Sequence, residues 1–168
     1  MLYYAGIGSR ETPVDLGDLI AKIASAFAAR GFTLNSGAAN GADKMFECGQ
    51  LVAGGLCDIY LPWSYFNNHE SHLVTQWAEA RQIASTIHPK WDSLSQAVKK
   101  LHARNIHQVL GRDLATPVEC VVCWTPGGKS VGGTRTAVEL AKSRNIPVFN
   151  LWHSMHIQQL RQFLRGYK

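Results

Sequence analysis

Short apolar runs alternate with longer amphipathic segments along most of the chain. The apolar runs predict β-strands at residues 2–7, 32–35, 57–61, 118–124 and 146–151. Apolar residues at helical spacing predict helices at about residues 14–30, 42–52, 71–85, 94–110 and 155–164, with another beginning near Thr134. This alternation predicts an α/β fold with a doubly wound, mostly parallel sheet of about five strands flanked by helices.

The bulk composition fits one globular domain. The chain has 168 residues, which suits a single core, so we expect residues 1–168 to form one domain. Hydrophobic residues make up 46% and charged residues 17%, which argues against long disordered segments. No apolar stretch approaches the roughly 20 residues that a bilayer requires, and the first residues do not resemble a signal peptide. We therefore expect a cytoplasmic protein without membrane association.

The charge balance favours an anionic partner. Seventeen Lys and Arg residues against 12 Asp and Glu give a formal net charge of +5. A nucleotide or a nucleic acid would fit this excess.

The cysteines and histidines do not predict a metal site. Cys120 and Cys123 form a C-x-x-C pair, but residues three apart on a strand point to opposite faces and cannot readily share a metal or a disulfide. The remaining cysteines are scattered, and the closely spaced histidines lack carboxylate or thiol neighbours. We expect neither a metal nor a cofactor.

A glycine-rich turn follows the strand that ends near Trp124. Its small residues are Pro126, Gly127, Gly128, Gly132, Gly133 and Thr134. Glycines let a ligand approach the backbone closely, and a helix beginning at Thr134 would direct unpaired N–H groups and the positive end of its dipole at the same place. The turn therefore predicts a phosphate site. The alternative is a tight turn without a ligand.

Two more loops of small residues follow predicted strands. The loop at residues 8–13 contributes Gly8 and Ser9. The loop at residues 36–43 contributes Ser36, Gly37, Ala39, Gly41 and Asp43. Ligands of doubly wound sheets lie outside the carboxyl ends of the strands, so all three loops are candidates for one site. Asp43 either complements the dipole of its helix or accepts from a ribose or base.

Charged and aromatic side chains near these loops are further candidates. Arg10 and Glu11 directly follow the first strand and form either a loop ion pair or part of the site. Lys100, Arg104 and Gln108 lie on one helix stripe, which favours a solvated face, with a phosphate-facing lid as the alternative. Trp63 follows the third strand and is the aromatic candidate for stacking on a base.

These motifs resemble the DNA-processing protein A (Smf) group of the SLOG superfamily. The shared motifs are G-S-R at residues 8–10, S-G-x-A-x-G-x-D at residues 36–43 and the late Gly-Gly and Gly-Gly-Thr sequences. The resemblance spans nearly the whole chain and is strongest to small single-domain members found in phage genomes. It implies a Rossmann-like fold and a nucleotide-type ligand, with Arg104 and Asn105 near the site. Glu47 stands where that group usually has His.

The Lonely Guy phosphoribohydrolases of the same superfamily suggest a reaction. Their motif P-G-G-x-G-T-x-x-E places a glutamate at a nucleotide N-glycosidic bond. Here the next acid after Thr134 is Glu139, two residues too late, and two helical residues turn a side chain by about 200°. Glu139 should face away from the site. Hydrolysis would then need Glu11, Asp43 or Asp113 as the carboxylate, with Arg10 on the phosphate or leaving group.

Two functions follow from these residues. In the first, the protein binds a nucleotide or nucleotide derivative, as a sensor or as an N-glycosidase acting on a nucleoside monophosphate. In the second, it binds single-stranded DNA, which the positive charge favours. Single-domain relatives often associate through their helices, so the resemblance also implies a homo-oligomer.

Overall fold

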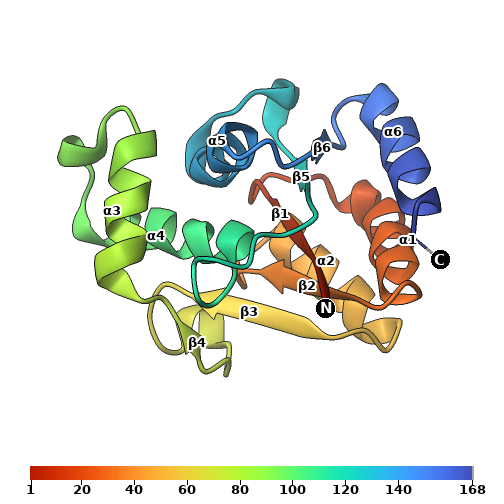
Figure 1. The fold of residues 1–168 in the computed structure, drawn as a ribbon, viewed down its shortest axis with the longest axis horizontal. Coiled ribbons are helices and arrows are strands. Elements are labelled where there is room, and N and C mark those ends of the chain that lie inside the picture. Colours follow the sequence, from red (N-terminus) through yellow and green to blue (C-terminus); the bar gives the residue numbers. More distant parts are fainter. Residues whose placement is uncertain (168) are drawn as a thin grey trace.

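Six parallel strands form one sheet in the order β4-β3-β2-β1-β5-β6 (Figure 1). The structure is a computed structural model and describes residues 1–167. The strands are β1 (Leu2–Gly8), β2 (Phe32–Ser36), β3 (Cys57–Leu61), β4 (Leu73–Val74), β5 (Cys120–Trp124) and β6 (Val148–Asn150). The predicted α/β class with a parallel sheet is confirmed.

Strand β4 was not predicted. It has two residues and lies within the segment expected to be a helix at residues 71–85. Ser71 Oγ and Thr75 Oγ1 donate to the carbonyl oxygens of Ile59 and Leu61 on β3, at 2.5 and 2.8 Å, and fix the segment beside the sheet. Two residues are too few to show strand periodicity, so the sheet has six strands instead of about five.

Helices cover both faces of the sheet. One face carries α1 (Gly17–Ala28), α2 (Ala42–Val52) and α6 (Ser154–Arg165), and the other carries α3 (Trp77–Ile87), α4 (Gln96–Leu110) and α5 (Arg135–Ser143). Figure 1 shows α1 beside α6 and α3 beside α4. Single 3₁₀ turns are η1 (Val14–Leu16), η2 (Phe66–Asn68), η3 (Trp91–Ser93), η4 (Pro126–Gly128) and η5 (Gly132–Thr134).

Strand β5 shows how the sequence divides the core. Cys120 packs with α1, α2 and α6, whereas Cys123 packs with α3, α4 and α5. Both thiols are buried and free. The prediction that this C-x-x-C pair points to opposite faces is confirmed, because the side chains of a strand alternate.

The strand order reverses at β1. The chain proceeds from β1 through β2, β3 and β4 in one direction, and then returns to place β5 on the other side of β1. The loops after β1 and β5 therefore leave the same edge of the sheet in opposite directions, which opens a crevice between them. No helix within residues 1–167 combines the length and apolar character of a membrane span.

Candidate functional site

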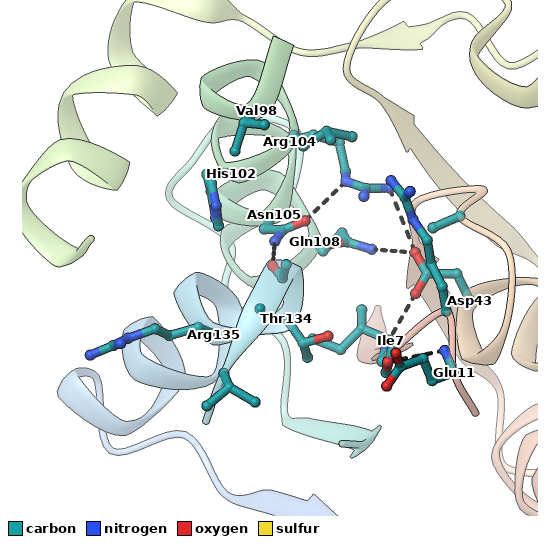
Figure 2. A pocket seen from close by; sticks show the side chains of 18 of the residues that line it. Ile7, Glu11, Asp43, Val98, His102, Arg104, Asn105, Gln108, Thr134 and Arg135 are labelled. Carbon is teal, nitrogen blue, oxygen red and sulfur yellow. Dashed lines mark hydrogen bonds and ion pairs between the residues drawn. The ribbon is translucent and has the colours of Figure 1, made fainter. Parts of the chain in front are cut away.

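A cavity of about 760 Å³ lies at this switch point. Figure 2 shows α4 on one side and the loops after β1 and β5 on the others. Twelve of the predicted site residues line it: Gly8, Ser9, Arg10, Glu11, Ala39, Asp43, Arg104, Asn105, Pro126, Gly132, Gly133 and Thr134. The topology thus brings residues from all three predicted loops to one place.

Asp43 is the centre of a buried polar network beneath the cavity. Its carboxylate accepts the backbone N–H of Gly8 at 3.1 Å and Nε2 of Gln108 at 3.3 Å, and Nη1 of Arg104 lies 3.6 Å away. The side chains of Asp43 and Arg104 are 4% and 6% exposed. Burial raises the pKa of Asp43, and the guanidinium of Arg104 acts in the opposite direction. Through these contacts, Asp43 connects the loop after β2 to the end of β1 and to α4.

Helix α4 connects this network to the glycine turn. Arg104 donates through Nη1 to the carbonyl oxygen of Gly37 and through Nε to Oδ1 of Asn105. Asn105 then donates through Nδ2 to the carbonyl oxygen of Gly133 at 2.5 Å (Figure 2). Arg104 and Gln108 are only 5% and 1% exposed, so the expected solvated stripe is wrong for both.

The two glycine pairs have different surroundings. Gly132 and Gly133 line the cavity, and no acceptor in residues 1–167 receives their backbone N–H groups. Gly128 instead faces the beginning of α6, where an added Cβ would come within 2.3 Å of His153 Nε2. Neither Gly127 nor Gly128 lines the cavity. The chain turns at Gly127, which has a φ of 65°, and this separates the two pairs.

Arg10 and Glu11 remain available to a ligand. Both side chains are exposed and line the cavity, and they form no ion pair with each other within the described chain. The loop is held by its backbone instead: Ser9 Oγ accepts the N–H of Glu11 at 3.1 Å, and Thr12 Oγ1 donates to the carbonyl oxygen of Ser9 at 2.6 Å. The alternative of an ion pair between Arg10 and Glu11 is therefore wrong for this loop.

Other predicted residues have structural contacts outside the cavity. Ser36 Oγ donates to the carbonyl oxygen of Gly6 at 2.7 Å, and its side chain is fully buried. Gly41 packs against the backbone of residues 9 and 10. Trp63, 37% exposed, lies edge-on to Phe66 with a centroid distance of 5.1 Å. Neither Ser36, Gly37, Gly41 nor Trp63 lines the cavity.

The two other candidate carboxylates lie away from the site. Asp113 accepts the N–H groups of Ala115 and Thr116, both at 2.9 Å, and so caps its own loop. Glu139 pairs with Lys142 at 3.2 Å and does not line the cavity, as its position in the helix predicts. Glu11 is therefore the accessible carboxylate among those considered.

Several cavity residues were not predicted. The polar ones are His88, His102 and Arg135, and the apolar ones are Ile7, Leu94, Val98, Leu101 and Val131. Gln108, which the lid alternative for the α4 stripe included, also lines the cavity. Counting back from Asn105 by three and four residues along α4 reaches His102, Leu101 and Val98, so helical spacing carried the signal. Among residues 1–167 no group of three or more His, Cys, Asp or Glu side chains is arranged to hold a metal.

Comparison with known proteins gives a likeness to a solved structure. No protein-family model and no curated protein matches the chain. A solved structure of DNA processing protein A from Helicobacter pylori, which concerns the single-stranded DNA binding mode of that protein, superposes with a TM-score of 0.62. The two sequences are 15% identical, and the superposition covers 99% of this chain and 82% of the Helicobacter pylori chain. The two share a Rossmann-like fold. At this identity the likeness shows the fold alone.

Two histidines, His88 and His102, line the cavity, and the pKa of His102 departs further from its ordinary value. His102 is 4% exposed, and its Nδ1 lies 2.7 Å from Oγ1 of Thr136. Burial, followed by the nearby His88 and Arg104, lowers the pKa of His102 to about 4. The imidazole is therefore neutral at pH 7.

This histidine should make the protein less stable in acid. The pKa of His102 is lower in the folded chain than in the unfolded chain, so unfolding takes up a proton between about pH 6.5 and pH 4. The free energy of unfolding should fall through that window by on the order of 3 kcal/mol from this residue. Urea unfolding of the protein and of His102→Asn at several pH values measures it. Equal pH slopes would contradict the assignment.

Proposed function

We propose that the cavity binds a nucleotide or nucleotide derivative, with its phosphate on the N–H groups of Gly132 and Gly133. The observation that carries this proposal is that these two N–H groups have no acceptor within residues 1–167 and belong to residues that line the cavity just before α5. Unpaired N–H groups and the helix dipole favour an anion at such a position. A cavity of about 760 Å³ lies in the range of small-molecule sites.

The charges around the cavity support an anionic ligand. Asp43 and Arg104 largely neutralise each other as a buried pair. The other charged residues that line the cavity are Arg10, Arg135 and one carboxylate, Glu11, and neither arginine has an ion-pair partner within the described residues. The cavity therefore has an excess of positive charge, and a guanidinium binds phosphate oxygens well.

Removal of Arg10 should weaken nucleotide binding without unfolding the protein. Arg10 is exposed and makes no side-chain hydrogen bond within residues 1–167, so Arg10→Ala should leave the melting temperature nearly unchanged. A lost charge-assisted contact costs about 1.5–3 kcal/mol, which is roughly a 10- to 100-fold increase in Kd. Isothermal titration with nucleoside monophosphates measures it. Arg161→Ala, an exposed charge on α6 outside the cavity, is the matched control. Equal losses in both variants would indicate a general charge effect and contradict the site.

If the protein also hydrolyses the nucleotide, Glu11 is assigned as the general base. Its carboxylate would take a proton from water as the oxygen bonds to C1′ of the ribose, while the C1′–N bond breaks and the base leaves with the electron pair. Glu11→Gln should then retain nucleotide binding but release no free base, as measured by chromatography. Unchanged release of the nucleobase by Glu11→Gln would exclude this role. If the unaltered protein releases no nucleobase, it binds the nucleotide without hydrolysing it.

Single-stranded DNA binding is the second candidate. It is favoured by the likeness to DNA processing protein A, whose solved structure concerns single-stranded DNA binding, and by the net charge of +5. The affinity for an oligonucleotide should then fall steeply with salt, because several phosphates release counterions. A mononucleotide site should saturate with one ligand per chain and respond less to salt. The salt dependence of the two ligands therefore separates the proposals.

A further inference from the structure

The cavity has two chemically different ends. Figure 2 shows Asp43 and Glu11 on one side and His102, Val98 and Arg135 on the other, with Thr134 between them. The first end is built from charged groups of the loops after β1 and β2. The second end is bounded by the first turns of α4 and by the residues before it, where the apolar side chains of Leu94 and Val98 lie beside His88 and His102.

His102 is the most buried of the polar side chains at this end, which also include His88 and Arg135. Leu94 and Val98 are apolar side chains of this end, whereas Leu101 packs against the cluster of Ala38, Ala39 and Phe66. The ring of His88 lies 4.6 Å from the ring of His102, between centroids. Nδ1 of His102 is occupied by the hydroxyl of Thr136, whereas Nε2 has no hydrogen-bond partner within residues 1–167. This contact to Thr136 fixes the ring, so Nε2 is held in a defined position.

These surroundings select a particular chemical group. The apolar side chains Leu94 and Val98 offer no partner to a charged group, and Arg135, which also lines this end (Figure 2), disfavours a cation. A planar, uncharged heterocycle can cover the apolar side chains with its faces and hydrogen bond at its edge.

We propose that His102 is a specificity-determining residue that hydrogen bonds, through Nε2, to the base of the bound nucleotide at this end of the cavity. The inference rests on the proposed nucleotide function and adds where the base lies. The phosphate then lies at Gly132 and Gly133, and the sugar spans the interval beside Thr134. The protein then recognises the base of the nucleotide as well as its phosphate.

Two isosteric substitutions separate this role from a structural one. In His102→Gln, the amide reaches the position of Nε2 but loses the contact to Thr136. In His102→Asn, the amide occupies the position of Nδ1, keeps the contact to Thr136 and loses the group that meets the ligand. The affinities for AMP, GMP, CMP and UMP and for ribose 5-phosphate are measured for both variants and the unaltered protein by isothermal titration. Melting temperatures are measured in parallel.

The expected pattern is specific. The unaltered protein should bind its preferred monophosphate at least about tenfold more tightly than ribose 5-phosphate. His102→Gln should keep this preference within about threefold, and His102→Asn should lose it while remaining the more stable of the two variants. Equal binding of the monophosphate by the unaltered protein and His102→Asn would overturn the proposal. So would a loss confined to His102→Gln, which would identify the Thr136 contact as the important one.

The outcomes also separate this inference from the proposed function. If neither the four monophosphates nor ribose 5-phosphate bind saturably, the nucleotide function itself is wrong. If ribose 5-phosphate binds as tightly as every monophosphate, the phosphate site stands and the base site at His102 is wrong.

Discussion

Replacing Arg104 with methionine should lower the free energy of unfolding by about 3–5 kcal/mol, because it leaves Asp43 charged and buried without its partner. The two side chains are 6% and 4% exposed, and their charged atoms lie 3.6 Å apart. The substitution also removes the donors to Gly37 and Asn105, which connect the loop after β2 to the glycine turn. Urea unfolding monitored by circular dichroism measures the loss.

The same helix provides the control for Arg104. Lys100 lies one turn earlier on α4 and is exposed, so Lys100→Met should change the free energy of unfolding by less than about 0.5 kcal/mol. Adding Asp43→Asn to Arg104→Met should restore part of the stability, because it removes the unpaired charge. A loss below 1 kcal/mol in Arg104→Met would show that this network does not hold the cavity together.

Gly41→Ala should be nearly as damaging, because the loops after β1 and β2 meet at this residue. Gly41 has φ +84° and ψ −130°, outside the left-handed helical region, which disfavours alanine by about 1–3 kcal/mol. An added Cβ would also lie 2.4 Å from the carbonyl oxygen of Ser9 and 2.8 Å from Cα of Arg10. Since backbone atoms cannot move aside cheaply, we expect a total loss of about 3 kcal/mol or more, with displacement of Arg10 from the cavity. Urea unfolding and nucleotide titration measure the two effects.

Gly54→Ala is the control at a positive-φ glycine where no clash arises. Gly54 has a φ of +73°, and an added Cβ would meet nothing within 4 Å. This variant should lose only about 1–2 kcal/mol and bind nucleotides normally. Equal losses at both positions would show that the close approach of the two loops contributes nothing.

Most of the fold was predictable from the sequence because its strands and helices follow clear periodicities. In α1, the buried residues Ile20, Ile23, Ala24 and Phe27 have the helical spacing that predicted them. The bounds of α2 also match the prediction. Strand β4 was missed because two residues are fixed by side-chain bonds to β3, and such tertiary contacts leave no periodic signal.

The site was predictable where it consists of backbone loops and less so where α4 contributes. The rule that ligands lie at the carboxyl ends of parallel strands was enough to bring Arg10, Asp43 and Gly132 together. Polar residues at helical spacing are usually solvated, which is why Arg104 and Gln108 were expected to be exposed. Their burial depends on Asp43, a partner 61 residues from Arg104 that only the fold brings near.

The most direct test of the central claim is an NMR titration of ¹⁵N-labelled protein with nucleoside monophosphates. If the phosphate binds at the start of α5, the amide resonances of Gly132 and Gly133 should shift to lower field and saturate at one ligand per chain. Gly127 and Gly128, which lie outside the cavity, should shift much less. Saturable binding that leaves the Gly132 and Gly133 amides unchanged, or no binding of any monophosphate, would contradict the account.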